Sequence, residues 1–459
     1  MAPTMHPMRL RARLSVRCGR GGIGRRARFR FLWGKTRGGS IPLARTLDAR
    51  TRRRKAALFH FDIGLLSVIY LDNNATTAPS ITVVEAVRCA LHESWGNPSS
   101  VHPFGALARE SVECARSDVA RAIGASTREV VFTSGGTESC NLALFGSLGH
   151  EPGRHLLVTA QTEHAAVREC ATAVESGEWR AGSDRGEVTW VDLDAEGRVD
   201  LGQLSRLLGK RASEVAVVSL MWANNETGVI QPVEQIAMIC REHGVRFHTD
   251  ATQCLGRMVI DASRIGCDLL SISAHKAHGP KGAGALYCRR GVSLVGQAVG
   301  GPQERGRRGG TENVAGICGF GVACSEASQW LARGDMPMKQ LAQWRDAFES
   351  AVAAAVPGAV VIGQRVPRLW NTSLIAFPRL QSEALLVELG RLDVAASAGA
   401  ACSSGSLDPS PVLLAMGIDR EVAHGAVRFS MSRLTTQREM DDASARVVQA
   451  VQSVARAMP

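Results

Sequence analysis

The sequence lacks the cysteine spacings that build metal sites and disulfide frameworks. Its twelve cysteines are scattered singly, with no CxxC pair and no Cys and His spacing of the zinc type. In a chain of 459 residues, isolated cysteines do not resemble a disulfide framework. We therefore expect no metal site and a reducing, cytoplasmic setting in which most cysteines are small core residues.

An apolar run long enough to cross a bilayer is also missing. The longest apolar stretch near the start, residues 56–71, is interrupted by His60 and Asp62, whereas a membrane helix needs about 20 apolar residues. With 45% hydrophobic and 21% charged residues, the composition is that of a globular protein rather than a fibre or a disordered chain. We expect no membrane contact, and the length allows two or three domains.

Excess positive charge is absent from most of the chain, although the formal net charge is +11. Residues 1–66 contain 17 Lys and Arg against 2 Asp and Glu, whereas residues 67–459 contain 37 against 41. The charge therefore gives no reason to expect nucleic-acid binding by the core. Because this arm has no helical or strand periodicity, three interpretations compete: a disordered basic tail, a targeting peptide, or upstream sequence read from a wrongly chosen start codon, which we favour.

Strand-like and helix-like segments alternate through the middle of the chain. Apolar runs predict strands at 129–133, 155–160, 215–220, 245–250 and 269–273, with 285–288 also strand-like, and a helix is predicted over 233–243. This alternation favours a mostly parallel sheet covered by helices on both faces. In such sheets ligands bind at the carboxyl ends of the strands.

Polar side chains follow five of these predicted strands. The first is followed by Ser134-Gly-Gly-Thr-Glu-Ser139 and an apolar helical run, and glycines at a helix start offer free N–H groups to a phosphate. The later strand ends carry Glu163 with His164, Asn224-Asn-Glu-Thr-Gly228, Asp250 with Gln253, and His275 with Lys276. Polar residues after five strands are more than surface loops would carry by chance. Because these strand ends are expected at one edge of the sheet, we expect them to form one ligand site.

Lys276 ends the last of these strands, where a lysine is costly to desolvate unless something pairs with it. One cofactor uses the whole set, because pyridoxal 5'-phosphate needs an anion site, a lysine for a Schiff base and a carboxylate near its pyridine nitrogen. Asp250 would keep that nitrogen protonated, so that the ring accepts the electrons released at the substrate's Cα. The alternative is that Asp250 caps a helix and Lys276 is a surface residue.

Cys402 is the cysteine whose surroundings suggest reactivity. It lies in Ala396-Ser-Ala-Gly-Ala-Ala-Cys-Ser-Ser-Gly-Ser406, a run of small residues with nothing large to pack around a sulfur. This composition predicts an exposed loop, which is where a thiol that must reach a substrate would be placed. A turn that contains an incidental cysteine is the alternative.

The sequence resembles the pyridoxal-phosphate cysteine desulfurases of the nitrogen-fixation and iron–sulfur-cluster type, a class V aminotransferase-like family with fold type I. The likeness runs from about Ile69 to Met440 through YLDNNATT, GNPSS, FTSGGTES, NNETGVIQP, FHTDATQ, SAHKAHGPKG, GGTENVAGI and RFSMSR. It implies an α/β fold with a mostly parallel seven-stranded sheet in a large domain and a smaller α+β domain. The expected boundaries are 1–66 for the basic arm, 67–80 for a segment joining the small domain, 81–330 for the large domain and 331–459 for the small domain.

The resemblance also implies a role for each matching residue. Lys276 would bind the cofactor, Asp250 would pair with the pyridinium nitrogen, and His164 would stack on the ring and move protons. The remaining cofactor contacts would be Gln253 at the ring hydroxyl and Gly136, Thr137, Ser273 and His275 at the phosphate, with Thr311 reaching the phosphate of the other subunit of a homodimer. The substrate carboxylate would bind Arg428, Asn225 and Asn74.

The activity that the resemblance implies is that of a cysteine desulfurase, a sulfurtransferase. L-Cysteine would displace Lys276 from its Schiff base and lose its Cα proton, and the Cys402 thiolate would take the sulfur as a persulfide and leave L-alanine. The sulfur would pass to an acceptor protein, either a cluster scaffold or a tRNA-thiolation relay. The family's usual segment is close to SSGSACTSG, and two hydroxyl residues near the cysteine are alanine or glycine in this chain.

Other functions stay open at this point. If Cys402 is inert, the same scaffold could be another class V aminotransferase or lyase, and the appearance of alanine and persulfide from cysteine separates this case. A selenocysteine lyase would share every cofactor residue, but it would strongly prefer selenocysteine and give little sulfide from cysteine. A nucleic-acid-binding module acting through the Arg-rich arm would show salt-sensitive binding that disappears when residues 1–66 are deleted.

Overall fold

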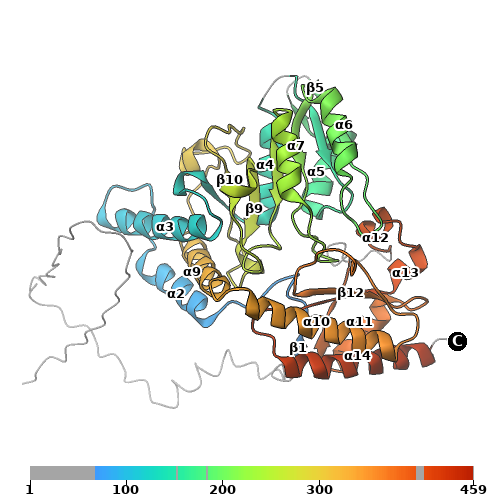
Figure 1. Ribbon diagram of the computed structural model, residues 1–459. Helices are drawn as coiled ribbons and strands as arrows, with labels where there is room; N and C mark the ends of the chain where they lie inside the picture. Colours follow the sequence, from blue (N-terminus) through green and yellow to red (C-terminus); the bar gives the residue numbers. More distant parts are fainter. Residues whose placement is uncertain (1–67, 151–152, 182–183, 400–407, 458–459) are drawn as a thin grey trace, which may run out of the picture. The chain divides into compact units, whose positions relative to one another are not determined.

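The structure, a computed structural model, describes residues 68–150, 153–181, 184–399 and 408–457 (Figure 1). The basic arm expected over 1–66 and the predicted nucleophile Cys402 lie outside the described residues. Within the described ranges, no helix is both long and apolar enough to span a membrane.

Seven strands of the described chain form the central sheet, in the order β2-β10-β9-β8-β7-β3-β6. Strand β10 is antiparallel to both of its neighbours, whereas the pairs from β9 across to β6 are parallel. The mostly parallel sheet predicted from the sequence is therefore confirmed. The strands are β2 (Val130–Thr133), β3 (Leu156–Thr159), β6 (Glu187–Trp190), β7 (Val215–Ser219), β8 (Phe247–Asp250), β9 (Leu269–Ser273) and β10 (Gly284–Cys288).

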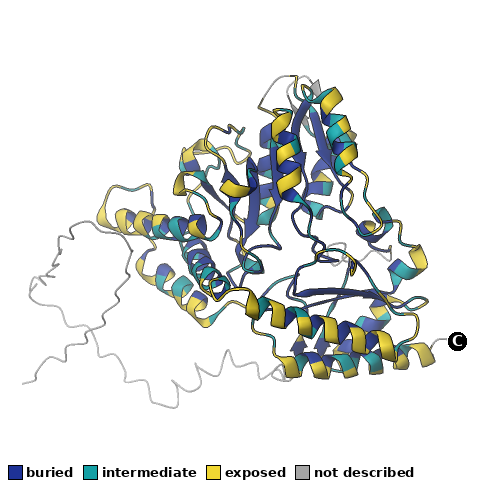
Figure 2. Ribbon diagram, in the orientation of Figure 1, coloured by how far each residue is buried: buried dark blue, intermediate teal, exposed yellow. Residues whose placement is uncertain are grey.

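Helices cover both faces of this sheet, so successive residues of a strand enter different cores. Val217 packs in a core with α4 and α5, whereas the next residue, Val218, packs in a core with α3, α6, α7 and α9. Figure 2 shows the strands buried beneath helices whose outer faces are exposed. These helices are α3 (Pro103–Ala122), α4 (Gly136–Leu148), α5 (Ala165–Ser176), α6 (Leu201–Arg211), α7 (Val233–Glu242) and α9 (Val314–Leu331).

A second, antiparallel sheet of order β11-β12-β15-β14 belongs to the C-terminal part of the described chain. Helices α10 and α14 lie side by side (Figure 1) and share a core with Ile375 of β12 and Phe429 of β15. The elements are β11 (Val360–Val361), β12 (Thr372–Ala376), β14 (Ser397–Ala398), β15 (Ala426–Ser430), α10 (Asp335–Ala355), α11 (Ser382–Arg391), α12 (Pro411–Ala415), α13 (Arg420–His424) and α14 (Gln437–Ala457).

The first described strand, β1 (Ile69–Tyr70), also belongs to this second core. It pairs in parallel with β13 (Val394–Ala395), and Ile69 and Leu71 pack among the residues of that core. The chain then enters α2 (Ile81–Glu93), which packs against α9. The segment between Leu71 and Ile81 therefore connects the second core with the elements around the central sheet. Three short elements complete the fold: α8 (Ala262–Ile265), β4 (Arg180–Ala181) and β5 (Asp184–Arg185).

A buried histidine links three strands of the central sheet. His248 Nδ1 lies 2.8 Å from Ser219 Oγ, and His248 Nε2 lies 2.9 Å from Ser271 Oγ. Burial lowers the pKa of His248 to about 4. The ring is therefore uncharged at neutral pH, and both of its nitrogens are hydrogen-bonded inside the sheet.

We expect acid to destabilise this sheet partly through His248. Because the pKa of His248 is about 4 in the fold and about 6.5 in an unfolded chain, the unfolded state binds more protons between these values, and stability falls as the pH drops through them. His248→Asn removes the titration but keeps hydrogen-bonding groups. In urea unfolding at about pH 6.5 and 4.5, the wild type should lose about 2 kcal/mol more stability than the variant; an equal loss in both proteins would contradict this explanation.

Candidate active site

The polar strand ends predicted from the sequence surround a single cavity of about 260 Å³. It lies at the carboxyl ends of the parallel strands, the edge at which such sheets bind ligands. Parallel pairing brings these segments to one edge although they are far apart in the sequence. The lining residues are Ala75, Gly136, Thr137, His164, Ala166, Met221, Ala223, Asn225, Asp250, Thr252, Gln253, Ser273, His275 and Lys276.

Lys276 follows β9 in a single 3-10 turn, Ala274–Lys276, which directs its side chain into the cavity. Its Nζ donates hydrogen bonds to the backbone oxygens of Asn74, at 2.5 Å, and Ala75, at 2.7 Å. Both acceptors belong to the segment that connects the second core to α2. The amine is therefore held at a defined point of the cavity wall by uncharged carbonyl groups.

Asp250, the last residue of β8, is buried at the base of the cavity. Its Oδ1 accepts a hydrogen bond from the backbone N–H of Thr252 at 2.9 Å. Within the described residues, no hydrogen bond involves the other carboxylate oxygen, Oδ2. A buried carboxylate with one oxygen available is suited to pair with a protonated ring nitrogen.

A candidate anion site lies at the start of α4. Gly136 and Thr137 form the first turn of this helix and line the cavity, and the N-terminus of a helix attracts negative charge. The hydroxyls of Thr252 and Ser273 are buried there without a hydrogen-bond partner in the described part of the chain. Buried hydroxyls are ordinarily bonded, so these two groups indicate the place of a bound acceptor such as a phosphate oxygen.

His275 adds an uncharged donor to the same wall. Burial, assisted by the neighbouring cation of Lys276, lowers the pKa of His275 to about 4. Its Nδ1 lies 3.2 Å from Thr76 Oγ1. Together, the anion site, the amine of Lys276 and the carboxylate of Asp250 fit pyridoxal 5'-phosphate, whose phosphate, aldehyde carbon and ring nitrogen need these three groups.

His164 and Gln253 complete the predicted cofactor contacts in the cavity. His164 Nδ1 accepts a hydrogen bond from the backbone N–H of Ala166 at 3.0 Å, which caps α5 and puts the proton of the neutral ring on Nε2. The Gln253 side chain donates from Nε2 to the backbone oxygen of Asn74 at 3.1 Å. The structure thus brings together all of the predicted cofactor residues of this cavity.

Arg257 is a buried residue of this site that the sequence reasoning missed. It is 4% exposed and donates from Nη1 to Gln253 Oε1 at 2.6 Å and from Nη2 to the backbone oxygen of Asn73 at 3.0 Å. Burial lowers its pKa to about 10. The guanidinium fixes the orientation of the Gln253 amide. No sequence signal points to Arg257, because it lies beyond the strand end and acts through tertiary contacts.

Glu163 follows a predicted strand, and the sequence predicts no specific role for it. Its Oε1 accepts a hydrogen bond from the backbone N–H of Met221 at 2.6 Å, and its Oε2 is buried with no partner in the described ranges. Burial raises the pKa of Glu163 well above its usual range. This carboxyl supports the cavity wall formed by Met221 and the neighbouring His164.

The residues predicted to bind the substrate carboxylate lie in and behind the cavity wall. Asn225 lines the cavity, and its buried Oδ1 has no hydrogen-bond partner within the described residues. Arg428 of β15 lies behind it and donates from Nη1 to the backbone oxygen of Asn225 and from Nη2 to Asp72 Oδ1, each at 2.9 Å. Asn74 uses its amide to join Thr372 Oγ1, at 2.9 Å, with the backbone oxygen of Asn225, at 3.1 Å. Their substrate contacts remain predictions.

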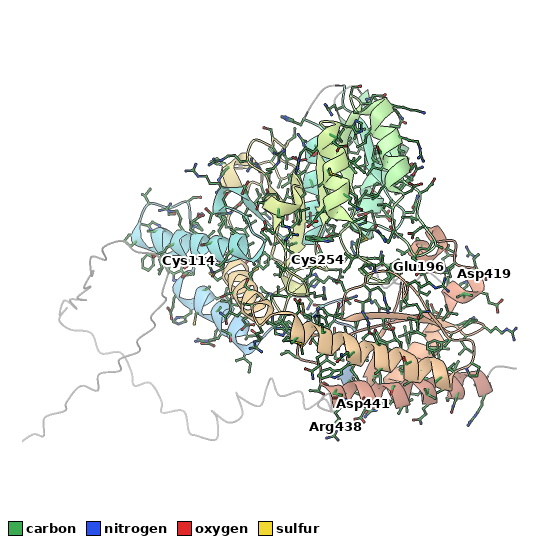
Figure 3. All side chains as sticks on the ribbon, viewed as in Figure 1. Cys114, Glu196, Cys254, Asp419, Arg438 and Asp441 are labelled. Atoms are coloured by element: carbon green, nitrogen blue, oxygen red, sulfur yellow. The ribbon has the colours of Figure 1, made fainter. Side chains whose placement is uncertain are left out.

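Two further predicted residues are not brought into this cavity by the described part of the chain: Thr311 lies elsewhere, and Cys402 is outside the described residues. Thr311 is exposed and does not line it, so the contact expected with another subunit stays a prediction. Cys402 belongs to residues 400–407, which are not described. The described cysteine nearest in sequence to the cofactor residues is Cys254, labelled in Figure 3, which is fully buried. Burial raises the pKa of the Cys254 thiol well above its usual range, so this cysteine is not suited to be a nucleophile.

Comparison with known proteins agrees with this geometry. Residues 69–442 match the family described as Aminotransferase class-V. The chain belongs to this family. The family resemblance, fold type I and pyridoxal 5'-phosphate, all expected from the sequence, are thereby confirmed, and the chain is an enzyme of the class V family.

Relatives of this class V chain carry consistent names. It is 42% identical over 376 residues to "Cysteine desulfurase 2" of Trichormus variabilis, covering 82% of this chain and 91% of the relative. It is 43% identical over 374 residues to "Cysteine desulfurase NifS" of Azotobacter vinelandii, covering 81% and 90%. Among solved structures, a "NifS-like protein" is 33% identical with a TM-score of 0.75, covering 84% of this chain and 100% of that one.

Lys276→Ala is expected to abolish the visible absorbance that the lysine-linked cofactor gives to a class V enzyme, because Nζ is the amine held in the cavity. The measurement is an absorption spectrum after incubation with pyridoxal 5'-phosphate and removal of excess cofactor. Lys281→Ala is the matched control, since Lys281 is an exposed lysine of the same loop and its loss should leave the spectrum unchanged. A normal visible band in Lys276→Ala would refute the assignment of Lys276.

Proposed function

We propose that this chain is a cysteine desulfurase, which removes the sulfur of L-cysteine and leaves L-alanine. The observation that carries the proposal is the cavity at which Lys276, Asp250 and the unpaired hydroxyls of the anion site meet. The names of its relatives support the same activity. Sequence, geometry and comparison therefore agree on the reaction class.

The cofactor, when bound, supplies an electron-accepting ring that stabilises negative charge at the substrate's Cα. The residues of the chain determine where protons move. Lys276 Nζ, fixed by two carbonyl oxygens, is the base that takes the Cα proton and later returns a proton. Asp250 would hold the ring nitrogen of the bound cofactor in its protonated form, and His164, whose ring proton lies on Nε2 in the neutral form, would be the second group that transfers protons in the cavity.

Substrate orientation falls to Asn225 and Arg428. Arg428 Nε is buried and has no hydrogen-bond partner in the described ranges, so this N–H is the donor that a substrate carboxylate could use. Both Nη atoms of Arg428 already donate hydrogen bonds to Asn225 and Asp72, so a carboxylate would gain one hydrogen bond from Nε together with the charge of the guanidinium. The carboxylate of L-cysteine bound on this side would hold the substrate's Cα within reach of Lys276.

Sulfur transfer is assigned to Cys402. Its thiolate attacks the sulfur of the substrate, a new S–S bond forms, and the bond between that sulfur and the substrate's Cβ breaks. The electron pair stays with Cβ, which then takes a proton and becomes the methyl group of alanine, while the sulfur stays on Cys402 as a persulfide. The thiols of Cys140 and Cys254, which are fully buried, have pKa values raised by burial, so neither suits this role.

The proposal includes a homodimer in the reducing cytoplasm. Trp95 and Phe104 are 66% and 54% exposed, and their rings lie with centroids 5.2 Å apart at an angle of 30°. Leu91 and Val101, which are near them in the sequence, are also exposed. Exposed apolar patches of this kind mark interaction surfaces, and a second copy of the chain is the partner that the predicted role of Thr311 requires. The persulfide sulfur then passes to an acceptor protein, a cluster scaffold or a tRNA-thiolation relay.

Cys402→Ser tests this function directly. We expect the variant to keep the visible absorbance of the cofactor and its change on addition of L-cysteine, but to lose alanine formation by roughly 100-fold or more, because the group that accepts sulfur is gone. Cys89→Ser is the control, since Cys89 is a partly exposed thiol on α2, and it should keep full activity. Undiminished alanine formation by Cys402→Ser would overturn the assignment, and a wild type that turns over selenocysteine but not cysteine would favour a selenocysteine lyase.

A further inference from the structure

Glu226 is a buried acid for which the reaction outlined above has no role. It lies in the loop Asn224–Gly228 after β7 and is 4% exposed. Asn224 Oδ1 accepts hydrogen bonds from the backbone N–H groups of Glu226, at 2.8 Å, and Thr227, at 2.9 Å. The backbone of this loop is therefore fixed by its own first side chain, and the neighbouring residue Asn225 lines the cavity.

The carboxyl of Glu226 bonds to Ser410, which follows the Cys402 segment and belongs to the range described from residue 408. Its Oε2 accepts a hydrogen bond from Ser410 Oγ at 2.5 Å. Ser410 is the N-cap of α12, and its Oγ accepts from the backbone N–H groups of Val412 and Leu413 at 3.1 and 3.3 Å. Because these amides occupy the lone pairs of the oxygen, the hydroxyl proton is directed at Glu226.

The same carboxylate oxygen touches the chain on the other side of Cys402. Gly399 is the last described residue before the Cys402 segment, and a Cβ added to Gly399 would lie 2.8 Å from Glu226 Oε2. A Cβ at this distance would require the carboxyl to move, and the hydrogen bond from Ser410 opposes that movement. One oxygen therefore meets both Gly399 and Ser410, which flank the segment that carries Cys402.

A purely structural role does not explain an acid at this position. Burial raises the pKa of Glu226, whereas Arg428, Arg168 and His164 act in the opposite direction. Burying a carboxyl costs free energy even when it is hydrogen-bonded, and Ser410 caps α12 without help from Glu226. The carboxyl of Glu226 connects the loop Asn224–Gly228 with Gly399 and Ser410, the residues on either side of the Cys402 segment.

We propose that Glu226 is a positioning residue for sulfur transfer, which fixes both ends of the segment carrying Cys402 through its contacts with Ser410 and Gly399. It thereby sets the point from which the thiol of Cys402 reaches the substrate. This inference rests on the proposed function, in which Cys402 accepts the sulfur. Glu226 acts through these two neighbours and contacts neither reacting atom.

Three variants of the full-length, cofactor-loaded enzyme separate positioning from general stability. Glu226→Ala and Ser410→Ala should each lower kcat for alanine formation by about tenfold, because small displacements of a reacting group are costly. The KM for L-cysteine and the cysteine-induced change in cofactor absorbance should stay within about twofold. Glu226→Gln, which keeps an oxygen for Ser410, should recover most of the activity. A parallel loss of cofactor absorbance, or no recovery with glutamine, would overturn positioning in favour of a structural role.

Gly399 provides a double-mutant test of the contact. Gly399→Ala should impair alanine formation in the wild type, because its Cβ would press on Glu226 Oε2. In Glu226→Ala the space is free, so the same change should cost much less there. Such non-additivity is the signature of two residues in contact. Equal losses from Gly399→Ala in both backgrounds would contradict the proposal.

Alkylation of Cys402 tests the positioning without using the reaction. Wild type and Glu226→Ala, both without L-cysteine, are treated with iodoacetamide, and the Cys402 peptide is quantified by mass spectrometry with the Cys89 peptide as internal reference. Releasing both flanks should raise the rate at Cys402 by about threefold or more and leave Cys89 unchanged. An unchanged rate overturns the role of Glu226 alone, whereas full alanine formation by Cys402→Ser overturns the proposed function itself.

Discussion

Parallel pairing of β9, β8, β7 and β3 is the constraint on which the rest of this structure depends. It puts the carboxyl ends of four strands at one edge, so that Lys276, Asp250, Asn225 and His164 share a cavity. The segment after β1 crosses this edge and supplies the carbonyl oxygens that hold Lys276 Nζ. Because β1 itself pairs with β13, the position of the reactive amine depends on both sheets, and the second sheet is part of the site rather than an appendage.

Several buried titratable groups support this cavity and the loops next to it. Arg257 orients Gln253, Glu163 supports the wall beside His164, and Glu226 meets the residues that flank the Cys402 segment. Each of these groups lowers the stability of the fold, because moving a charge or an acid out of water costs free energy. Exceptions to the ordinary rules of burial are expected where function requires them, and these three groups act on the candidate cofactor cavity or on the loops next to it.

Much of this site could be predicted from the sequence because it is built on strands buried on both faces. Strands β7 and β9 are predominantly apolar for that reason. The polar residues that follow them, such as Lys276, are therefore easy to recognise in the sequence. Strand β6 was missed because it lies at the sheet edge and is only partly buried. Arg257 could not be found, because its role comes from contacts with residues distant in sequence, such as Asn73, and the role of Thr311 requires a second subunit.

The central claim is that sulfur leaves L-cysteine and arrives on Cys402. The most direct measurement incubates the purified, cofactor-loaded protein with L-cysteine in the absence of added thiol, followed by mass analysis of the Cys402 peptide and an alanine assay on the same sample. The account predicts one added sulfur on Cys402 and the appearance of alanine. A protein whose bound cofactor still responds to cysteine, but which adds no sulfur to Cys402 and forms no alanine, would contradict it.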